Sequence, residues 1–149
     1  MDTISNATQR YHRLVLLVDA NIEHDSLTQE ISQRMCTETI NVNLELSKHL
    51  LGQTVRQRKL YLSKSMNEIL PENKNILLDK IEILFDVELG QDPLRLLESL
   101  SRNQTVVAFW NGQVKNNKLI YAEQGHQEYR TYDTHDISII EINNDKVEI

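Results

Sequence analysis

Three short runs of apolar residues are the feature of this sequence that most restricts its fold. They are residues 13–18 (RLVLLV), 75–79 (NILLD) and 105–110 (TVVAFW). Runs of this length without a polar residue at every second position are typical of strands buried on both faces of a sheet. Segments with helical character separate them along the chain. This alternation predicts an α/β fold with a mainly parallel sheet, and we expect the three runs to be neighbouring parallel strands.

Weaker patterns indicate the remaining elements. The clearest helix follows Asp92, which is suited to cap it, with Pro93 at the first helical position. Other helices are expected at residues 26–35, 44–55 and 66–70, and other strands at 39–42, 118–122 and 137–142. The last strands form either a hairpin or a sheet edge. We therefore expect one domain over residues 1–149, with a sheet of about five strands and a loose segment at residues 1–9.

The composition argues against several functional classes. The formal net charge of −6 is wrong for a chain that binds nucleic acid over its whole surface. The single cysteine, Cys36, cannot form an intramolecular disulfide, and neither it nor the five scattered histidines have metal-ligand spacing. No apolar run is long enough to span a bilayer, and no secretory signal pattern is present. A reducing, cytoplasmic setting is the simplest expectation.

The loop after the first apolar run is a candidate nucleotide site, because a strand, a short loop and a helix also form a P-loop. The pattern G-x-x-x-x-G-K-[ST], laid over residues 19–26 (DANIEHDS), puts Asp19 and His24 at the glycines, Asp25 at the lysine and Ser26 at the hydroxyl residue. The glycines allow the backbone to wrap a phosphate, and the lysine supplies positive charge. Acids in their place repel phosphate. On this stretch alone we favour an ordinary strand followed by a helix capped by its own Asp25 or Ser26.

Two later strand ends carry residues that suit an ATPase fold. Asp79 ends its apolar run as the Mg²⁺-organising acid of a Walker B motif does. Lys80 follows it where the AAA+ pattern has a catalytic glutamate, and Glu82 is out of register for that role. Asn111 follows the third run, where an AAA+ domain places a polar sensor residue at a strand tip. Each has a simpler interpretation, Asp79 as a cap and Asn111 as a turn residue, but their order and spacing together favour an ATPase-like fold.

Three segments of the chain carry a resemblance to a known family. NVNLELSKHLLGQTVRQRKL (41–60), NILLDKIEILFDVELGQDPLRLLESLSRNQTVVAFWNG (75–112) and YAEQGHQEYRTY (121–132) resemble BrxF, a small P-loop-type component of type 3 BREX bacteriophage-exclusion systems. The similarity runs from about residue 14 to residue 132. It implies a P-loop NTPase fold of the AAA+ type, a three-layer α/β sandwich. In that fold the strand of Asp79 lies beside the strand ending at Val18 or the one ending at Trp110.

The resemblance also implies a role in prokaryotic antiviral defence, beside a DNA methyltransferase and a large ATPase. The family's P-loop would fall on residues 19–26, where this sequence departs most from the pattern. We therefore expect no ATP or Mg²⁺ cofactor and no catalytic residue, and a degenerate ATPase domain that acts as a protein-binding or assembly subunit. Its expected partners are other components of the system, such as the large ATPase, or a second copy of the chain. The alternatives are an active NTPase with an atypical loop and a DNA-binding accessory subunit.

Two further features are candidate interaction surfaces. The segment TVRQRKLYLSKS (54–65) is locally basic in an acidic chain, through Arg56, Arg58, Lys59 and Lys64. It is either a contact for DNA phosphates or an acidic partner, or a solvated helix end and loop. Arg102, at the end of the helix that follows Asp92, is either a contact between subunits or the partner of Glu98 in an intrahelical ion pair.

Overall fold

The computed structural model describes residues 13–19, 25–72, 75–122, 125–143 and 146–147 of the chain. Its strands are β1 (Leu14–Asp19), β2 (Thr39–Asn41), β3 (Asn75–Asp79), β4 (Thr105–Lys115), β5 (Lys118–Tyr121), β6 (Arg130–Asp133), β7 (Ser138–Asn143) and β8 (Lys146–Val147). Its helices are α2 (Asp25–Met35), α3 (Val42–Leu50), α4 (Val55–Ile69) and α5 (Pro93–Leu100), with two 3₁₀ turns, η1 (Glu82–Phe85) and η2 (Val87–Leu89).

Five strands form a parallel sheet in the order β2-β3-β4-β1-β7. β4 lies between β1 and β3, and Leu14 of β1 is opposite Val106 of β4 at the start of a register that ends with Asp19 opposite Asn111. The prediction that the three apolar runs are neighbouring parallel strands is confirmed. The strand of Asp79 lies beside the strand of Trp110, which is one of the two placements expected.

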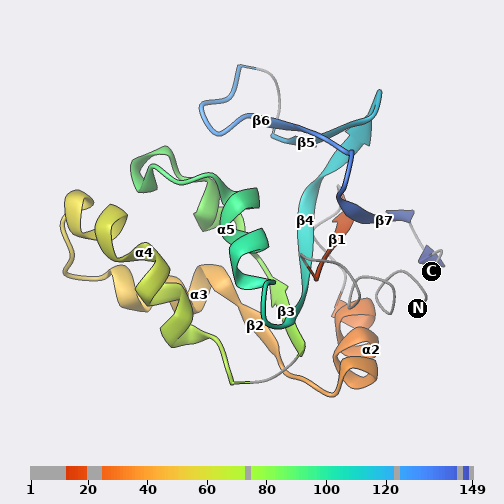
Figure 1. The fold of residues 1–149 in the computed structure, drawn as a ribbon, viewed down its shortest axis with the longest axis horizontal. Coiled ribbons are helices and arrows are strands. Elements are labelled where there is room, and N and C mark those ends of the chain that lie inside the picture. Colours follow the sequence, from red (N-terminus) through yellow and green to blue (C-terminus); the bar gives the residue numbers. More distant parts are fainter. Residues whose placement is uncertain (1–12, 20–24, 73–74, 123–124, 144–145, 148–149) are drawn as a thin grey trace.

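Both faces of the sheet are covered by helices, which makes the domain a three-layer α/β structure (Figure 1). Successive residues of a strand point to opposite faces. Leu16 of β1 packs with α3, α4 and α5 on one face, and Leu17 packs with Ile31 and Met35 of α2 on the other. Because both faces are buried, the strand needs apolar residues at every position, which is the pattern seen in the sequence.

The direction in which the chain winds changes between β1 and β4. From the end of β1 the chain crosses to the β2 edge, whereas from the end of β4 it continues toward β7. Right-handed crossovers then place α2 on one face and α3 to α5 on the other, as observed. Open α/β sheets bind ligands at the carboxyl ends of strands where the winding reverses. The carboxyl ends of β1 and β4 are therefore the first place to look for a site.

The basic segment lies within α4, so of the two interpretations the solvated helix end and loop is wrong about the loop. α3 ends at Leu50, and Gly52, with φ of +80°, turns the chain before α4 begins. A capping box starts α4: the hydroxyl of Thr54 accepts from the N–H of Gln57 at 3.1 Å, and the Gln57 side chain accepts from the N–H of Thr54 at 2.9 Å. The helix predicted at 66–70 is the last part of α4 rather than an element of its own.

The second half of β4 leaves the parallel sheet. β4 continues past the predicted end at Trp110 to Lys115, and from Gly112 onward it pairs antiparallel with β5. Asn116 and Asn117 join the two strands, both with positive φ, as a type I′ hairpin turn requires. β6, which the sequence pattern did not indicate, pairs with β5, and β7 then returns to the sheet parallel to β1. In the described ranges, no helix has the length and apolar character needed to cross a membrane.

Candidate functional site

Three of the predicted site residues meet at the carboxyl edge of the parallel sheet. Asp19 ends β1, Asp79 ends β3, and Asn111 lies in the strand between them, directly opposite Asp19. Parallel strands bring their carboxyl ends to one edge, so residues far apart in sequence become neighbours. Asn111 was expected at a strand tip. It lies instead inside β4, at the point where this strand leaves the parallel sheet.

A small pocket lies among these strand ends. It is lined by Asp19, Asp79, Lys80, Glu82, Phe109, Trp110 and Asn111. Its volume of ≈ 10 Å³ is about the room that one water molecule needs. Three acidic residues and one lysine line this space, so a bound anion would meet a net negative charge.

The turn after Asp79 is fixed by hydrogen bonds. Asp79 is only 7% exposed, and its Oδ1 accepts from the backbone N–H of Lys80 at 2.9 Å. Lys80 has φ of +51°, a left-handed conformation that is unusual for a residue other than glycine. Its carbonyl accepts from the N–H of Asn43 at 2.8 Å, and Asn43 Oδ1 in turn accepts from the N–H of Ile83 at 2.8 Å. Asp79 thus caps this turn, the simpler role considered for it, and also faces the pocket.

Glu82 is a pocket residue that sequence reasoning set aside. The left-handed turn at Lys80 brings the first residue of η1 back against the strand ends, so Glu82 lines the same pocket as Asp79. Burial raises the pKa of the Glu82 carboxyl above 4.5, and the charge of Asp79 adds to this, while backbone hydrogen bonds and Lys80 act in the opposite direction. The residue with positive φ in this turn is a lysine, so the sequence had no glycine there to indicate a left-handed turn.

An aromatic cluster packs around Trp110, which lines the pocket. The rings of Phe85 and Tyr121 stack with centroids 3.6 Å apart, and Trp110 meets both edge-on. Trp110 also donates from Nε1 to the carbonyl of Ile120 at 3.2 Å, which ties the parallel sheet to the β4–β5 hairpin. Burial, with the nearby charges of Glu82 and Glu128, raises the pKa of Tyr121 to about 12. The phenol is therefore protonated at neutral pH and cannot act as a base there.

A larger, open cleft adjoins the pocket on the far side of Asn111. It has a volume of ≈ 570 Å³ and is lined by β4, β5 and residues near His126 and Glu128. The Nδ1 atom of His126 accepts from the N–H of Glu128 at 3.0 Å. Asn111 is common to both spaces.

The residues of the P-loop template are only partly described. His24 lies outside the described residues, as do the four positions before it. Asp25 is the first residue of α2, so the position before the helix falls on His24. Ser26 is exposed in the first turn. Asp19 is the template residue that the structure places in the pocket lining.

The four basic residues of α4 do not form one surface. Arg56, Lys59 and Lys64 are exposed, and their spacing puts them on one side of the helix. Arg58 is half-buried and points away from them, toward α3 and η2. The stem of Lys59 lies over Gly90, within 3.4 Å of where a Cβ would be.

Arg102 lies just beyond α5, in the exposed turn that leads to β4. The helix ends at Leu100, so Arg102 lies outside it and a pair with Glu98 would not be the intrahelical pair considered as the alternative. Arg102 is accessible to a partner.

Across the residues that the structure describes, no group of three or more His, Cys, Asp or Glu side chains is arranged to hold a metal ion. Comparisons with models of protein families, with curated proteins and with solved structures find no match to this chain. The resemblance to BrxF therefore stays an interpretation of the sequence, and the chemistry of the site has to be argued from its own residues.

Proposed function

We propose that this chain is an AAA+-like domain with a degenerate nucleotide site, and that it acts as a protein-binding or assembly subunit of a bacteriophage-exclusion system. The observation that carries the proposal is the meeting of Asp19, Asp79 and Asn111 at one sheet edge. An ATPase needs its P-loop, Walker B acid and sensor residue around one phosphate chain. Three candidate motifs from separate parts of the sequence meet here at the edge where open α/β sheets bind ligands.

The chemistry of the same edge argues against a working ATPase. The sequence has no lysine between Asp19 and Ser26, and it has acids at Asp19 and Asp25. Lys80 stands where a catalytic glutamate would follow the Walker B acid. The pocket between the strand ends has room for about one water molecule, and its carboxyl groups repel phosphate. An ATPase-like domain that no longer hydrolyses ATP is best suited to binding other proteins.

Titration calorimetry with ATP and Mg²⁺ tests the degenerate site. We expect no binding heat and no hydrolysis above the buffer rate. Tight Mg²⁺-dependent binding of ATP would overturn the proposal in favour of the active NTPase with an atypical loop. The test uses the full chain, because the loop at residues 20–24 belongs to the template.

Affinity purification of the tagged chain from a host that carries the whole gene cluster tests the assembly role. We expect other components of the system, such as its large ATPase, or untagged copies of the chain to be retained. Arg102→Ala should reduce this retention, because Arg102 is exposed at the end of α5. Arg95→Ala is the control on the adjoining helix α5, since Arg95 is exposed and its guanidinium lies 4.0 Å from the carboxylate of Asp92. A chain that stays monomeric and retains no other component would contradict the assembly role.

The exposed basic side of α4 favours DNA binding as the second candidate function. Arg56, Lys59 and Lys64 project from one side of a helix in a chain that is otherwise acidic. Contacts of this kind to DNA phosphates weaken as salt rises. A salt-dependent gel shift that Arg56→Ala with Lys64→Ala abolishes would favour this function over protein binding alone.

A further inference from the structure

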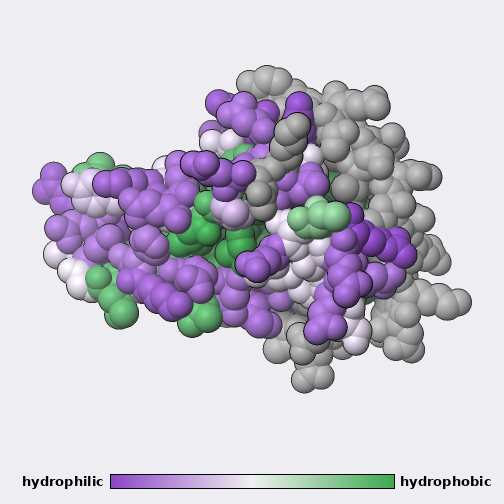
Figure 2. Space-filling model, turned by 90° about the horizontal axis from the view of Figure 1, so that it is seen from below, coloured by the Kyte–Doolittle hydropathy of each residue, from purple (hydrophilic) through white to green (hydrophobic). Residues whose placement is uncertain are grey.

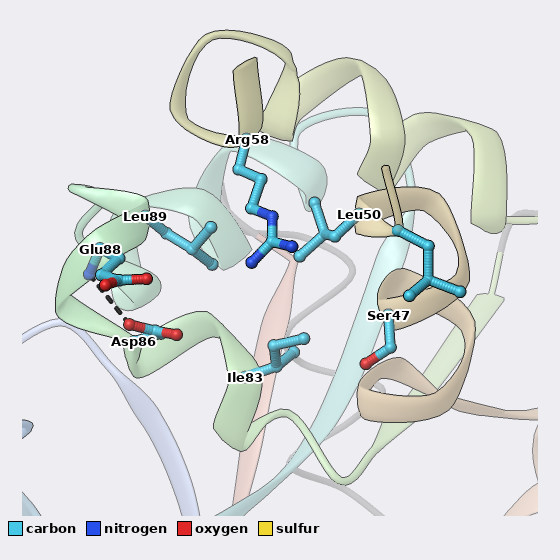
Figure 3. A pocket seen from close by; sticks show the side chains of 8 residues that line it. Ser47, Leu50, Arg58, Ile83, Asp86, Glu88 and Leu89 are labelled. Atoms are coloured by element: carbon cyan, nitrogen blue, oxygen red, sulfur yellow. Dashed lines mark hydrogen bonds between the residues drawn. The ribbon is translucent and has the colours of Figure 1, made fainter. Parts of the chain in front are cut away.

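A pocket on the other side of η1 from the sheet edge has a charge pattern that the proposed function does not use. It has a volume of ≈ 210 Å³ and lies between α3, α4 and the turns η1 and η2 (Figure 3). Leu50 and Leu51 from the end of α3, Ile83 from η1 and Leu89 from η2 give it aliphatic walls. This volume is below the roughly 300–1,000 Å³ of pockets that take drug-sized ligands, so it suits a smaller molecule.

Arg58 points from α4 into this pocket, as Figure 3 shows. Its Nε atom has no exposed surface and no hydrogen-bond partner. Among the described residues, no carboxylate lies within 4.0 Å of the guanidinium group. An arginine normally uses its donors in a fixed fork that matches a carboxylate. The terminal nitrogens of the guanidinium point into the pocket, where the carboxylate of a ligand would pair with them (Figure 3).

Two acids stand on the opposite side of the pocket. Asp86 Oδ1 accepts from the backbone N–H of Glu88 at 2.9 Å, which holds the Asp86 carboxylate in place at the start of η2 (Figure 3). Glu88 is exposed at the rim. The pocket thus keeps one positive and two negative groups apart instead of pairing them. A phosphate or another plain anion would satisfy Arg58 but would be repelled by Asp86 and Glu88.

From this arrangement we infer that the pocket binds a small aliphatic zwitterion, namely a free α-amino acid with a branched aliphatic side chain such as leucine. The α-carboxylate pairs with Arg58, the α-ammonium group pairs with Asp86 and Glu88, and the side chain lies against Leu50, Leu51, Ile83 and Leu89. An entirely apolar ligand would cover the charged guanidinium of Arg58 without giving it a partner. A zwitterion with an aliphatic side chain meets all three parts of the pocket, whereas a plain anion or an apolar molecule does not.

Titration calorimetry and thermal unfolding of the full chain with L-leucine test this inference. We expect saturable binding that raises the unfolding midpoint with ligand concentration. Arg58→Gln should weaken it by at least about tenfold, because a charge-assisted pair is lost. Arg56→Gln, an exposed neutralisation on the same helix, should leave it unchanged. A wild-type chain that does not respond to leucine overturns the inference, as does an Arg58→Gln variant that binds leucine normally.

Two leucine analogues assign the two charges. N-acetyl-leucine lacks the ammonium group and leucinamide lacks the carboxylate, so both should bind more weakly than leucine. Asp86→Asn keeps the oxygen that caps η2 but removes its charge, so it should weaken leucine and leucinamide and spare N-acetyl-leucine. This second variant keeps the inference testable where Arg58→Gln fails to fold. Equal binding of N-acetyl-leucine and leucine by the wild-type chain would overturn the zwitterion and leave only a carboxylate site.

Discussion

The hydroxyl of Tyr132 donates a hydrogen bond of 2.9 Å to Oδ1 of Asp92, the residue that caps α5. The same carboxylate oxygen accepts from the N–H groups of Leu94 and Arg95 at 3.1 and 3.4 Å. One carboxylate therefore starts a helix of the parallel layer and also holds β6 of the antiparallel ribbon. Trp110 lies edge-on to the Tyr132 ring, with centroids 5.8 Å apart, and closes the contact from the β4 side.

Tyr132→Phe should lower the free energy of unfolding by about 1 kcal/mol, since one hydrogen bond to a charged group is lost while the ring contacts stay. Denaturant unfolding monitored by circular dichroism measures the change. Tyr129→Phe is the control, because its hydroxyl forms no hydrogen bond with another described residue. Tyr129 bonds to His126 through its backbone N–H. Equal effects of the two substitutions would show that Asp92 does not hold the ribbon.

Gly112 is the position at which β4 passes from the parallel sheet to the hairpin, and it has no room for a side chain. A Cβ there would lie 2.0 Å from the carbonyl oxygen of Ile120 and 2.9 Å from Nε1 of Trp110. Because the closest atom is backbone, β4 and β5 would have to separate and the Trp110 hydrogen bond would be lost. Gly112→Ala should therefore destabilise the fold by about 1–3 kcal/mol. The exposed neighbour Gln113, changed to Ala, should leave the thermal midpoint nearly unchanged.

The parts of this fold that could be predicted are those with strong local signals. The apolar runs predicted β1, β3 and their neighbour β4, and Asp92 with Pro93 predicted α5. The first part of α4 was missed because only Leu62, Ser65 and Met66 of its residues are buried, so its charged face gives a weak helical pattern. The Thr54 capping box was the available signal. β6 depends on pairing with β5, which no local pattern encodes.

The residues of the candidate site also divide into those that the sequence predicts and those that it does not. Asp79 and Asn111 follow apolar runs, so their place at the sheet edge follows from strand direction alone. Glu82 joins them through a left-handed residue at Lys80, and Arg58 turns into its pocket because α3 and η2 leave space there. Both depend on backbone geometry and packing. The face of the molecule drawn in Figure 2 is largely hydrophilic, with scattered hydrophobic residues and one small hydrophobic hollow. No local sequence pattern indicates where such a hollow forms.

Glu82 should make stability depend on pH in a known direction. Its pKa is raised in the folded state, mainly by burial, so the folded state holds the proton more tightly than the unfolded state, whose value is near 4.5. The stability that the protonated group contributes is complete below that value and is lost as the pH rises through the folded pKa. Glu82→Gln should therefore stabilise the protein at pH 7, and the gain should vanish below about pH 4.

Chemical unfolding at several pH values measures this dependence. Glu72→Gln is the matched control, because Glu72 is exposed in the loop before β3. It should shift stability little across the same range. A gain from Glu82→Gln that is the same at pH 4 and pH 7 would show that ionisation of Glu82 is not the cause.

The loop at residues 19–26 allows a test of whether this is a P-loop position that has lost its chemistry. Asp25→Lys alone should not create ATP binding, because Asp19 and His24 still stand where the pattern requires glycine. The triple change Asp19→Gly, His24→Gly and Asp25→Lys restores the pattern beside Asp79, and it should give Mg²⁺-dependent ATP binding that calorimetry detects. Asp79→Ala in that background is the control and should reduce the binding, since this acid would organise the metal.

Asp25→Ala in the otherwise unchanged chain should preserve phage protection in a plaque assay, because the proposed role is binding rather than catalysis. Protection that disappears in this variant while its circular dichroism spectrum stays native would show that the loop is still functional.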